Sequence, residues 1–343
     1  MRRIIPTPEQ AVRPDGSPEY GIFQTPFQRL NLEEARFRRL MRVSRLKEWQ
    51  HIGIVHPEVY ISLAAVDLKY LAASWVFIYD RGTGLSFEHE RKLPGRRLVL
   101  PEVLWDARWS LDGGRGYRID MRNHLSVGEH ELRIDVRKDG GRAAALARLT
   151  LREDLERVHP LVAVLPLSKN RPFYTHKAPC PVEGTLRVGD RTFTFSPERD
   201  IALLDIHKAY YPRKTFWRWA TFATMGSDGA PLGINLTHNV IQPDDRYNEN
   251  ALWAGGRLHL LGSARFEIPE DPRAKWRIRT LDDLVDIEFR PLGERSENTN
   301  LLVVKSWYRQ PVGLFSGVVR DGRGGEHRIE EVWGIAEDHR VTW

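Results

Sequence analysis

Two β-strands joined by a tight turn are encoded in Gly184-Thr185-Leu186-Arg187-Val188-Gly189-Asp190-Arg191-Thr192-Phe193-Thr194-Phe195. Apolar and polar residues alternate on both sides of Gly189-Asp190. A Gly-Asp pair readily adopts the backbone conformations that a two-residue hairpin turn requires. The segment therefore predicts an antiparallel β-hairpin.

The same pattern of short predicted strands separated by turns continues along most of the chain in both directions. Turn signals such as Asp112-Gly113-Gly114 and Asp139-Gly140-Gly141 separate apolar or alternating runs. The pattern almost lacks βαβ alternation, and it contains no G-x-G-x-x-G or phosphate-binding loop, which argues against Rossmann and TIM-barrel folds. We expect a mainly β protein with two antiparallel β-barrel or curved-sheet domains. The expected strands lie at 52–54, 59–68, 71–79, 98–100, 115–121, 129–137, 145–151, 217–224, 230–236, 257–266, 276–280, 285–291, 307–313, 314–320 and 327–335.

The domain organisation follows from length and from the distribution of proline. A chain of 343 residues is longer than one hydrophobic core usually fills. A proline-rich stretch over 160–181 suggests a boundary between the two halves. Asn31, followed by glutamates and then by arginines, predicts a short N-terminal helix over about 32–46. The predicted parts are an N-terminal arm and helix (1–48), a first β domain (49–172) and a second β domain carrying the site (173–343).

Composition limits the class of protein and its partners. Hydrophobic residues make up 41% and charged residues 29%, as in ordinary soluble proteins. A net charge of +6 fits an acidic substrate or peripheral contact with an anionic lipid surface, although a solvated surface is the commoner explanation. There is no nucleic-acid motif, so no nucleic-acid partner is expected. The sequence has neither a signal-peptide core nor a transmembrane span, and it has a single cysteine, Cys180. We therefore expect a cytoplasmic location and neither a disulfide nor a cysteine metal cluster.

The strongest functional candidate is the segment from Leu204 to Trp219, which gathers an acid, an imidazole, phenols and indoles. An ionisable group in an apolar strand is unfavourable unless something inside uses or satisfies it. Asp205 and His207 alternate and so share one strand face, and the hairpin between the segments would bring His176 beside them. We predict Asp205, His176 and His207 as catalytic residues, with Asp205 a general acid whose pKa burial raises. A structural ion pair, or a strand end with core tryptophans, is the alternative.

Polar and aromatic residues in three places are candidates for substrate binding. The loop at 248–250 could equally consist of turn formers, and the C-terminal group could be a frayed tail. The predicted binding residues are Tyr174, Lys177, Tyr210, Trp217, Trp219, Asn235, Asn248, Glu249, Asn250, Trp253, Asp338 and His339.

Metal and cofactor chemistry lacks a recognisable motif in this sequence. His and Asp residues at 176, 205, 207, 338 and 339 are chemically able to bind a metal, but no short H-x-H or H-E-x-x-H spacing accompanies them. No G-x-S-x-G elbow indicates a serine hydrolase. We expect no metal and no cofactor.

Several motifs in combination resemble one bacterial protein family. They are Tyr174-Thr175-His176-Lys177, Pro181-x-x-Gly184-Thr185-Leu186, Asp205-x-His207-x-x-Tyr210-Tyr211-Pro212, Trp217-x-Trp219-Ala220-Thr221, Gly233-x-Asn235-Leu236, Asn248-Glu249-Asn250-x-x-Trp253, Gln310-x-x-Gly313 and Glu337-Asp338-His339. Together they resemble the DUF2804 family from about Arg45 to the end, and that family name implies no function.

A more distant resemblance joins the second half to the two-domain lipocalin-like group that includes carotenoid 1,2-hydratases, AttH-type proteins, fungal decalin-forming cyclases and tocopherol cyclase. In the hydratases an Asp protonates an alkene. The resemblance implies that Asp205 matches this acid, that His176 matches an upstream His, and that Trp217 or Trp219 lies on the following aromatic strand. Two positions depart from the hydratase pattern: Ala178 replaces an aromatic residue, and Leu203 replaces a tyrosine.

Together these observations predict a lipocalin-like protein with a ligand cavity at or between its barrels. The leading hypothesis is a cofactor-free acid–base enzyme, a hydratase, cyclase or isomerase, that acts on a hydrophobic or lipid-like substrate. The alternatives are a non-enzymatic carrier of hydrophobic ligands and a carbohydrate-active protein.

Overall fold

The protein folds into two antiparallel β-sheets. The computed structural model describes residues 2–36, 45–168, 170–301 and 304–343. The described ranges contain no helix longer than a single turn, and their two 3-10 turns span Leu32–Glu34 and Leu125–Val127. No helical segment in these ranges has the length and apolar character needed to cross a membrane.

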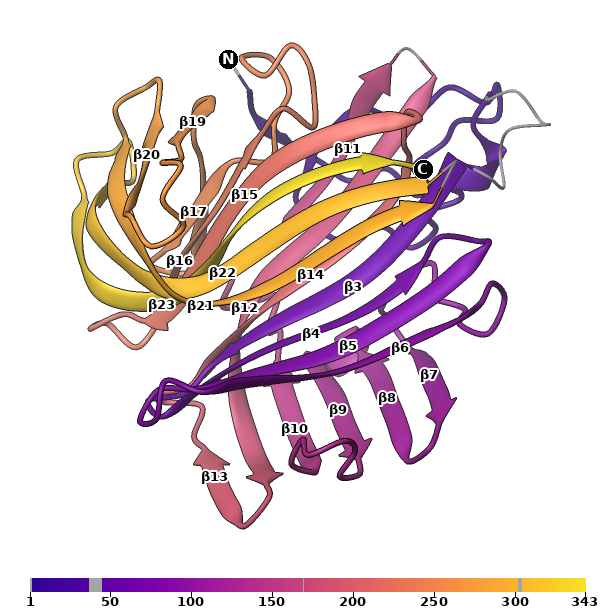
Figure 1. The fold of residues 1–343 in the computed structure, drawn as a ribbon. Coiled ribbons are helices and arrows are strands. Elements are labelled where there is room, and N and C mark those ends of the chain that lie inside the picture. Colours follow the sequence, from indigo (N-terminus) through magenta and orange to yellow (C-terminus); the bar gives the residue numbers. More distant parts are fainter. Residues whose placement is uncertain (1, 37–44, 169, 302–303) are drawn as a thin grey trace.

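The first sheet curves into a nearly closed barrel, so that its two end strands, β6 and β7, approach each other (Figure 1). The strand order along the barrel is β6-β5-β4-β3-β14-β12-β10-β9-β8-β7, and β1, β2, β11 and β13 pair outside this path. The bounds are β1 Ile4–Ile5, β2 Gly21–Phe23, β3 Leu46–Val55, β4 Val59–Asp67, β5 Leu71–Asp80, β6 Ser86–Pro94, β7 Ala107–Gly114, β8 Tyr117–His124, β9 Glu129–Val136, β10 Ala145–Arg152, β11 Leu161–Ser168, β12 Arg171–Val188, β13 Arg191–Phe195 and β14 Ile201–Tyr210.

The hairpin predicted at 184–195 is confirmed, since the end of β12 pairs with β13 from Gly184↔Phe195 to Val188↔Arg191. Strand β12 begins well before the hairpin, at Arg171, and only its last residues, Gly184–Val188, pair with β13. Its first half pairs with β11 and β14, and its second half pairs with β10 and β13. Gly184 has a φ of 126°, and a Cβ there would lie 2.2 Å from the Arg148 carbonyl oxygen, so the pairing of β12 with β10 requires glycine at this position.

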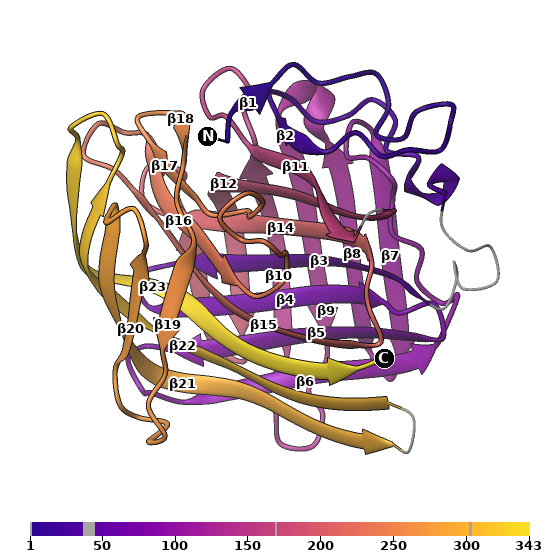
Figure 2. The same ribbon diagram turned by 90° about the horizontal axis from the view of Figure 1, so that it is seen from above.

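The second sheet is a half-barrel that lies against the outer face of the first (Figure 2). Its order is β18-β17-β16-β15-β23-β22-β21-β20-β19, so the C-terminal strand β23 is central and pairs with both β15 and β22. The C-terminal segment is therefore an integral part of the sheet and not a frayed tail. The bounds are β15 Lys214–Met225, β16 Pro231–His238, β17 Ala251–Ala254, β18 Arg257–Leu260, β19 Ala264–Glu267, β20 Trp276–Thr280, β21 Val285–Leu301, β22 Val304–Arg320 and β23 Glu326–Thr342.

Several details differ from the sequence prediction. The expected strand at 98–100 does not form, the one at 257–266 is divided between β18 and β19, and those at 307–313 and 314–320 are one strand, β22. Strands β12 and β14, which the sequence analysis assigned to the domain at 173–343, hydrogen-bond within the first sheet. The described residues of the predicted helix over 32–46 do not form one continuous helix: Leu32–Glu34 make only a 3-10 turn, Ala35 leaves helical geometry, Arg45 is helical and Leu46 begins β3. Residues 37–44 lie outside the described residues. The Asn31 side chain bonds the backbone of Val12 instead of capping a helix.

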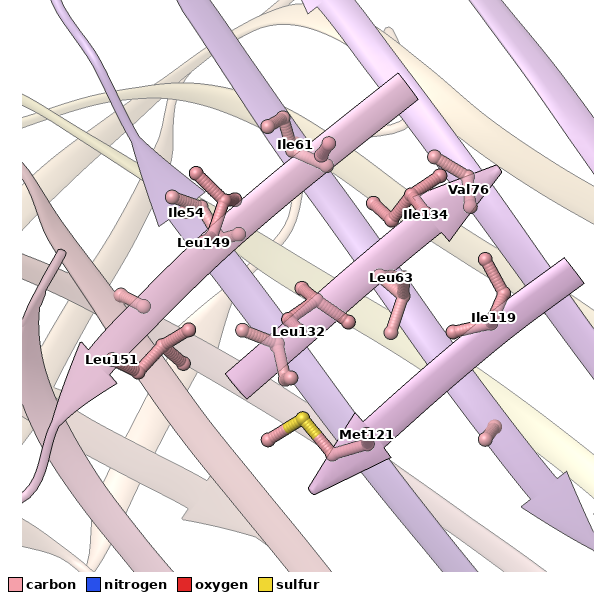
Figure 3. Packing of buried hydrophobic residues seen from close by; sticks show 14 of the residues in the cluster. Ile54, Ile61, Leu63, Val76, Ile119, Met121, Leu132, Ile134, Leu149 and Leu151 are labelled. Atoms are coloured by element: carbon pink, nitrogen blue, oxygen red, sulfur yellow. The ribbon is translucent and has the colours of Figure 1, made fainter. Parts of the chain in front are cut away.

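Strand β14 separates two hydrophobic cores, because its alternate residues face opposite ways. Ala202, Leu204 and Ile206 pack inside the barrel, while Leu203 packs between the sheets. Figure 3 shows the barrel core, where side chains such as Leu63 and Leu132 interlock. The core between the sheets is rich in aromatic residues, including Tyr60, Phe77, Trp217, Trp219 and Trp333. Full burial of one large apolar side chain stabilises the fold by roughly 1.5–3 kcal/mol.

Candidate active site

A cavity of about 190 Å³ lies between the two sheets, where strands β21–β23 pass over strands β3–β6 (Figure 1). Its wall is formed by the outward face of the barrel and by the facing residues of the half-barrel. Both faces contribute large aromatic rings to the wall: Trp49, Trp75, Phe173, Tyr211, Trp217, Trp219, Tyr308 and Trp343. Mostly apolar cavities with a few convergent polar groups are typical ligand sites.

Three buried groups meet in one part of this wall. Lys177 Nζ lies 2.7 Å from Asp205 Oδ1 and 3.0 Å from His207 Nε2, and His207 Nε2 lies 2.8 Å from Asp205 Oδ1. The register between β12 and β14 brings these three side chains together. Lys177 of β12 pairs with Asp205 of β14, and His207 lies two residues later on the same face of β14.

The charge state of Asp205 differs from the sequence prediction. Burial alone would raise the pKa of Asp205, but His207 and Lys177 interact with the carboxylate strongly enough to hold that pKa below its ordinary value. The expected rise was wrong, because the sequence did not reveal that Lys177 lies directly opposite. Asp205 is therefore a carboxylate at neutral pH.

Glu249 approaches the same cluster from the loop before β17. Its Oε1 accepts a 2.7 Å hydrogen bond from Thr237 Oγ1, and its backbone carbonyl accepts one from Asn235 Nδ2 at 2.7 Å. Its Oε2 lies 3.6 Å from Lys177 Nζ and has no hydrogen-bond partner among the described residues. Trp219 Nε1 donates to Asn235 Oδ1 at 2.7 Å. Asn235 therefore holds both the loop carboxylate and an aromatic wall in place.

A second carboxyl group, Glu337, lies in the wall on β23. Its Oε1 accepts a 2.7 Å hydrogen bond from Trp217 Nε1, and its Oε2 accepts one of 2.9 Å from Gln310 Nε2. Burial raises the pKa of Glu337 to about 7, with a further contribution from Asp205, and outweighs these hydrogen bonds, which lower it. Glu337 can therefore hold or release a proton near neutral pH.

A chain of hydrogen bonds connects Glu337 to the first sheet. Gln310 Oε1 accepts from Ser62 Oγ at 3.0 Å, and Ser62 Oγ lies 2.9 Å from His51 Nε2. Because the Ser62 hydrogen points to Gln310, His51 Nε2 carries the hydrogen of the second bond. Burial lowers the pKa of His51 to about 4, which keeps this imidazole neutral. The chain runs from β3 and β4 across the sheet interface to β22 and β23.

The aromatic wall is ordered around Trp49. Its ring stacks on Tyr211 at 5.5 Å and on Trp217 at 6.1 Å, and the His207 ring lies 4.8 Å away. His339 lies 4.4 Å from the Trp217 ring, and its Nε2 is 2.9 Å from the hydroxyl of Ser306. Burial lowers the pKa of His339 to about 3, so it is also neutral.

The structure brings together seven of the residues that the sequence analysis selected. They line one cavity: Lys177, Asp205, His207, Trp217, Trp219, Glu249 and His339. Asn235 lies directly behind them.

His176 does not join the cluster, and the prediction that it lies within reach of Asp205 was wrong. His176 is adjacent to Lys177 on β12, so its side chain points to the other face of the strand. There its Nε2 lies 2.6 Å from Glu153 Oε1, and His130 Nε2 lies 2.9 Å from the other oxygen of Glu153. Burial would raise the pKa of Glu153, but the two imidazoles lower it to about 2.

Several predicted binding residues have structural contacts away from the cavity wall. Tyr174 and Tyr210 pack with the N-terminal arm, and Trp253 lies in the core and donates to the His159 carbonyl. Asn248 and Asn250 bond backbone groups of their own loop and its neighbours. Asp338 lies on the opposite face of β23 from His339. These six placements correct the prediction. For Tyr174 and Asp338 the reason is that each is adjacent in a strand to a wall residue, and adjacent strand residues point to opposite faces.

The wall residues that sequence reasoning did not select include Trp49, His51, Tyr211, Gln310 and Glu337. Alternation could have found Glu337, which shares a strand face with His339 two positions later. His51 alternates with Trp49 in the same way. No sequence signal, however, relates β3 to β23.

Metal binding finds no support in the geometry of the described part of the chain. Within it, no three His, Cys, Asp or Glu residues are arranged to hold a metal ion. Lys177 Nζ already occupies the place among Asp205, His207 and Glu249 that a metal ion bound to them would take. The expectation of a cofactor-free protein remains a prediction.

The fold and cavity together define a mainly β protein of two stacked sheets with an aromatic site between them. The chain belongs to the family described as a domain of unknown function, DUF2804, whose model matches residues 2–343. This confirms the resemblance seen in the sequence. No curated protein matches the sequence.

Solved structures similar to this chain include a hydratase and a putative AttH. Kievitone hydratase from Nectria haematococca has a TM-score of 0.50 at 10% identity, with 87% of this chain and 88% of that chain covered. A putative AttH from Nitrosomonas europaea has a TM-score of 0.46 at 13% identity, with 86% and 92% covered. At this level of identity the likeness to the hydratase concerns the fold alone.

Proposed function

We propose that the protein is a cofactor-free acid–base enzyme that hydrates, cyclises or isomerises a hydrophobic, unsaturated substrate in the cavity between its sheets. The observation that carries the proposal is Glu337, a buried carboxyl group with a pKa of about 7 in an aromatic wall. A group with a pKa near the working pH is the most effective general acid or base, and such proton transfer typically contributes about 10²–10⁴-fold to the rate.

Glu337, and not Asp205, is the proton donor in this proposal. Asp205 is held as a carboxylate by Lys177 and His207, so it has no proton to give at neutral pH. The three groups, which share contacts of 2.7–3.0 Å, instead accept a proton from the substrate or return one to it. The rings of Trp49, Trp217 and Trp219 line the cavity and would stabilise positive charge that develops on a bound substrate.

The test uses solvent deuterium, because the natural substrate is unknown. Native mass spectrometry of protein purified from its host would identify the ligand that copurifies with it. That ligand is then incubated with protein in deuterated water and analysed again. We expect a water-sized mass change or incorporation of deuterium at carbon, both abolished by Glu337→Gln. A ligand that is bound and released unchanged, without deuterium, would establish the carrier function instead.

The carrier function is the second candidate, and the largely apolar cavity wall favours it. A carrier needs the cavity but not its ionisable groups. It should therefore bind its ligand equally well after Glu337→Gln and Asp205→Asn, provided that both variants keep their fold.

A further inference from the structure

The cavity wall contains more acid than base. Five carboxyl groups line it against three lysine and arginine side chains: Glu90, Asp205, Glu249, Glu297 and Glu337 against Lys92, Lys177 and Arg295. His207, which lies 2.8 Å from Asp205 Oδ1, adds a positive charge only when it is protonated. This excess of two acids falls to one when Glu337 is protonated. Lys92 and Arg295 are paired with Glu297 and Glu90, so the excess lies at the inner end, around Lys177.

Lys177 makes a hydrogen bond to only one of the two carboxylates beside it. Its Nζ lies at hydrogen-bond distance from Asp205 Oδ1 and His207 Nε2, at 2.7 and 3.0 Å. Glu249 Oε2 lies 3.6 Å away, beyond a normal hydrogen bond. Glu249 is 3% exposed, and this oxygen is buried without a hydrogen-bond partner among the described residues. Buried polar atoms are nearly always bonded, so an orphan oxygen in a cavity wall points to a group that arrives with a ligand.

We propose that the ligand of this cavity is a hydrophobic molecule with a protonated amine, and that Glu249 Oε2 accepts the hydrogen bond from that ammonium group. The proposal deepens the proposed function by naming the substrate class of the same site. The acid excess favours a cation over a neutral hydroxyl, and it disfavours an anion. The aromatic wall adds to this preference, because ring faces attract cations. Thr237 fixes the orientation of Glu249 by bonding its other oxygen.

Binding of a matched probe series tests the proposal. Phenylbutylamine, phenylbutanol and phenylbutyrate share one skeleton and differ only in the head group. Calorimetry at pH 7.5, where the amine is protonated, would measure each affinity. We expect the amine to bind at least about 10-fold more tightly than the alcohol, as a charge-assisted bond would provide, and the carboxylate to bind weakest. Equal affinity for amine and alcohol would overturn the proposal, and so would tightest binding of the carboxylate, which would make Lys177 the anchor.

Two variants locate the anchor. Glu249→Gln should weaken amine binding by about 10- to 100-fold and leave alcohol binding nearly unchanged. Glu297→Gln is the matched control, because it removes the same charge from the same wall but at a carboxylate already paired with Lys92. An equal loss in both variants would show a general charge effect and contradict the assignment to Glu249.

The test also remains decisive if Glu249→Gln does not fold, because the ranking of the three probes on the wild-type protein alone can refute the proposal. Binding requires no turnover, so failure here is separate from failure of the proposed function. Tight amine binding by a protein that never exchanges deuterium would support the ligand class and refute the enzyme.

Discussion

Glu337 should make the stability of this protein fall as pH rises. Its folded-state pKa is about 7, whereas the ordinary value for glutamate is 4.5. Between these two values the folded state binds more protons at this site than the unfolded state. Stability from this group is therefore fully present below pH 4.5 and is lost as pH rises through 7. At 1.36 kcal/mol per pKa unit, the difference amounts to about 3 kcal/mol.

The assay compares urea unfolding of wild type and Glu337→Gln at a series of pH values. Glutamine has the same shape but does not titrate, so the difference between the two free energies of unfolding isolates Glu337. We expect the variant to gain about 3 kcal/mol relative to wild type between pH 4.5 and 8. The free energy of unfolding of the variant should also differ from that of wild type by a constant amount at every pH. The reason is that the amide introduced by Glu337→Gln presents an NH₂ donor in place of one carboxylate oxygen that accepts from Trp217 or Gln310. A difference curve that is flat across this range would refute the reasoning, and Glu337 would then be an ordinary ionised carboxylate.

Three further perturbations follow from the same contacts. Lys177→Met should destabilise the fold by about 3–5 kcal/mol near neutral pH, because it leaves a buried carboxylate unpaired, and adding Asp205→Asn should recover part of this loss in a double-mutant cycle of urea unfolding. Gln310→Leu removes a hydrogen-bond donor to Glu337 and should raise the pKa of that carboxyl further, so the pH dependence of the unfolding free energy should shift to higher pH. Ser74→Ala is the control: it removes a buried hydroxyl inside the barrel, away from Glu337, and should leave this pH dependence unchanged. Asp205→Asn should keep the fold and slow deuterium exchange into the ligand by about 10²–10⁴-fold, and wild-type exchange rates would contradict its place in the reaction.

Local pattern was sufficient to predict the fold class. The alternation around Gly189-Asp190 and the spacing of the turns predicted an antiparallel β protein, because a strand has a period of two and hairpin turns need particular residues. The same period placed Asp205 and His207 on one face. Motif combinations predicted the DUF2804 family, whose model matches nearly the whole chain. Each of these patterns is read from short stretches of sequence, without knowledge of which stretches meet in the fold.

Tertiary structure decided which side chains share the cavity and what charge they carry. Lys177 lies opposite Asp205 through the register of β12 with β14, and this contact reversed the direction expected for the pKa of the acid. Glu337 and Gln310 meet His51 and Ser62 only because the half-barrel covers the outer face of the first barrel. Sequence patterns determine which face of its own strand a side chain occupies. The burial and neighbours that set a pKa depend on strands far away along the chain, and these are fixed only when the two sheets pack together.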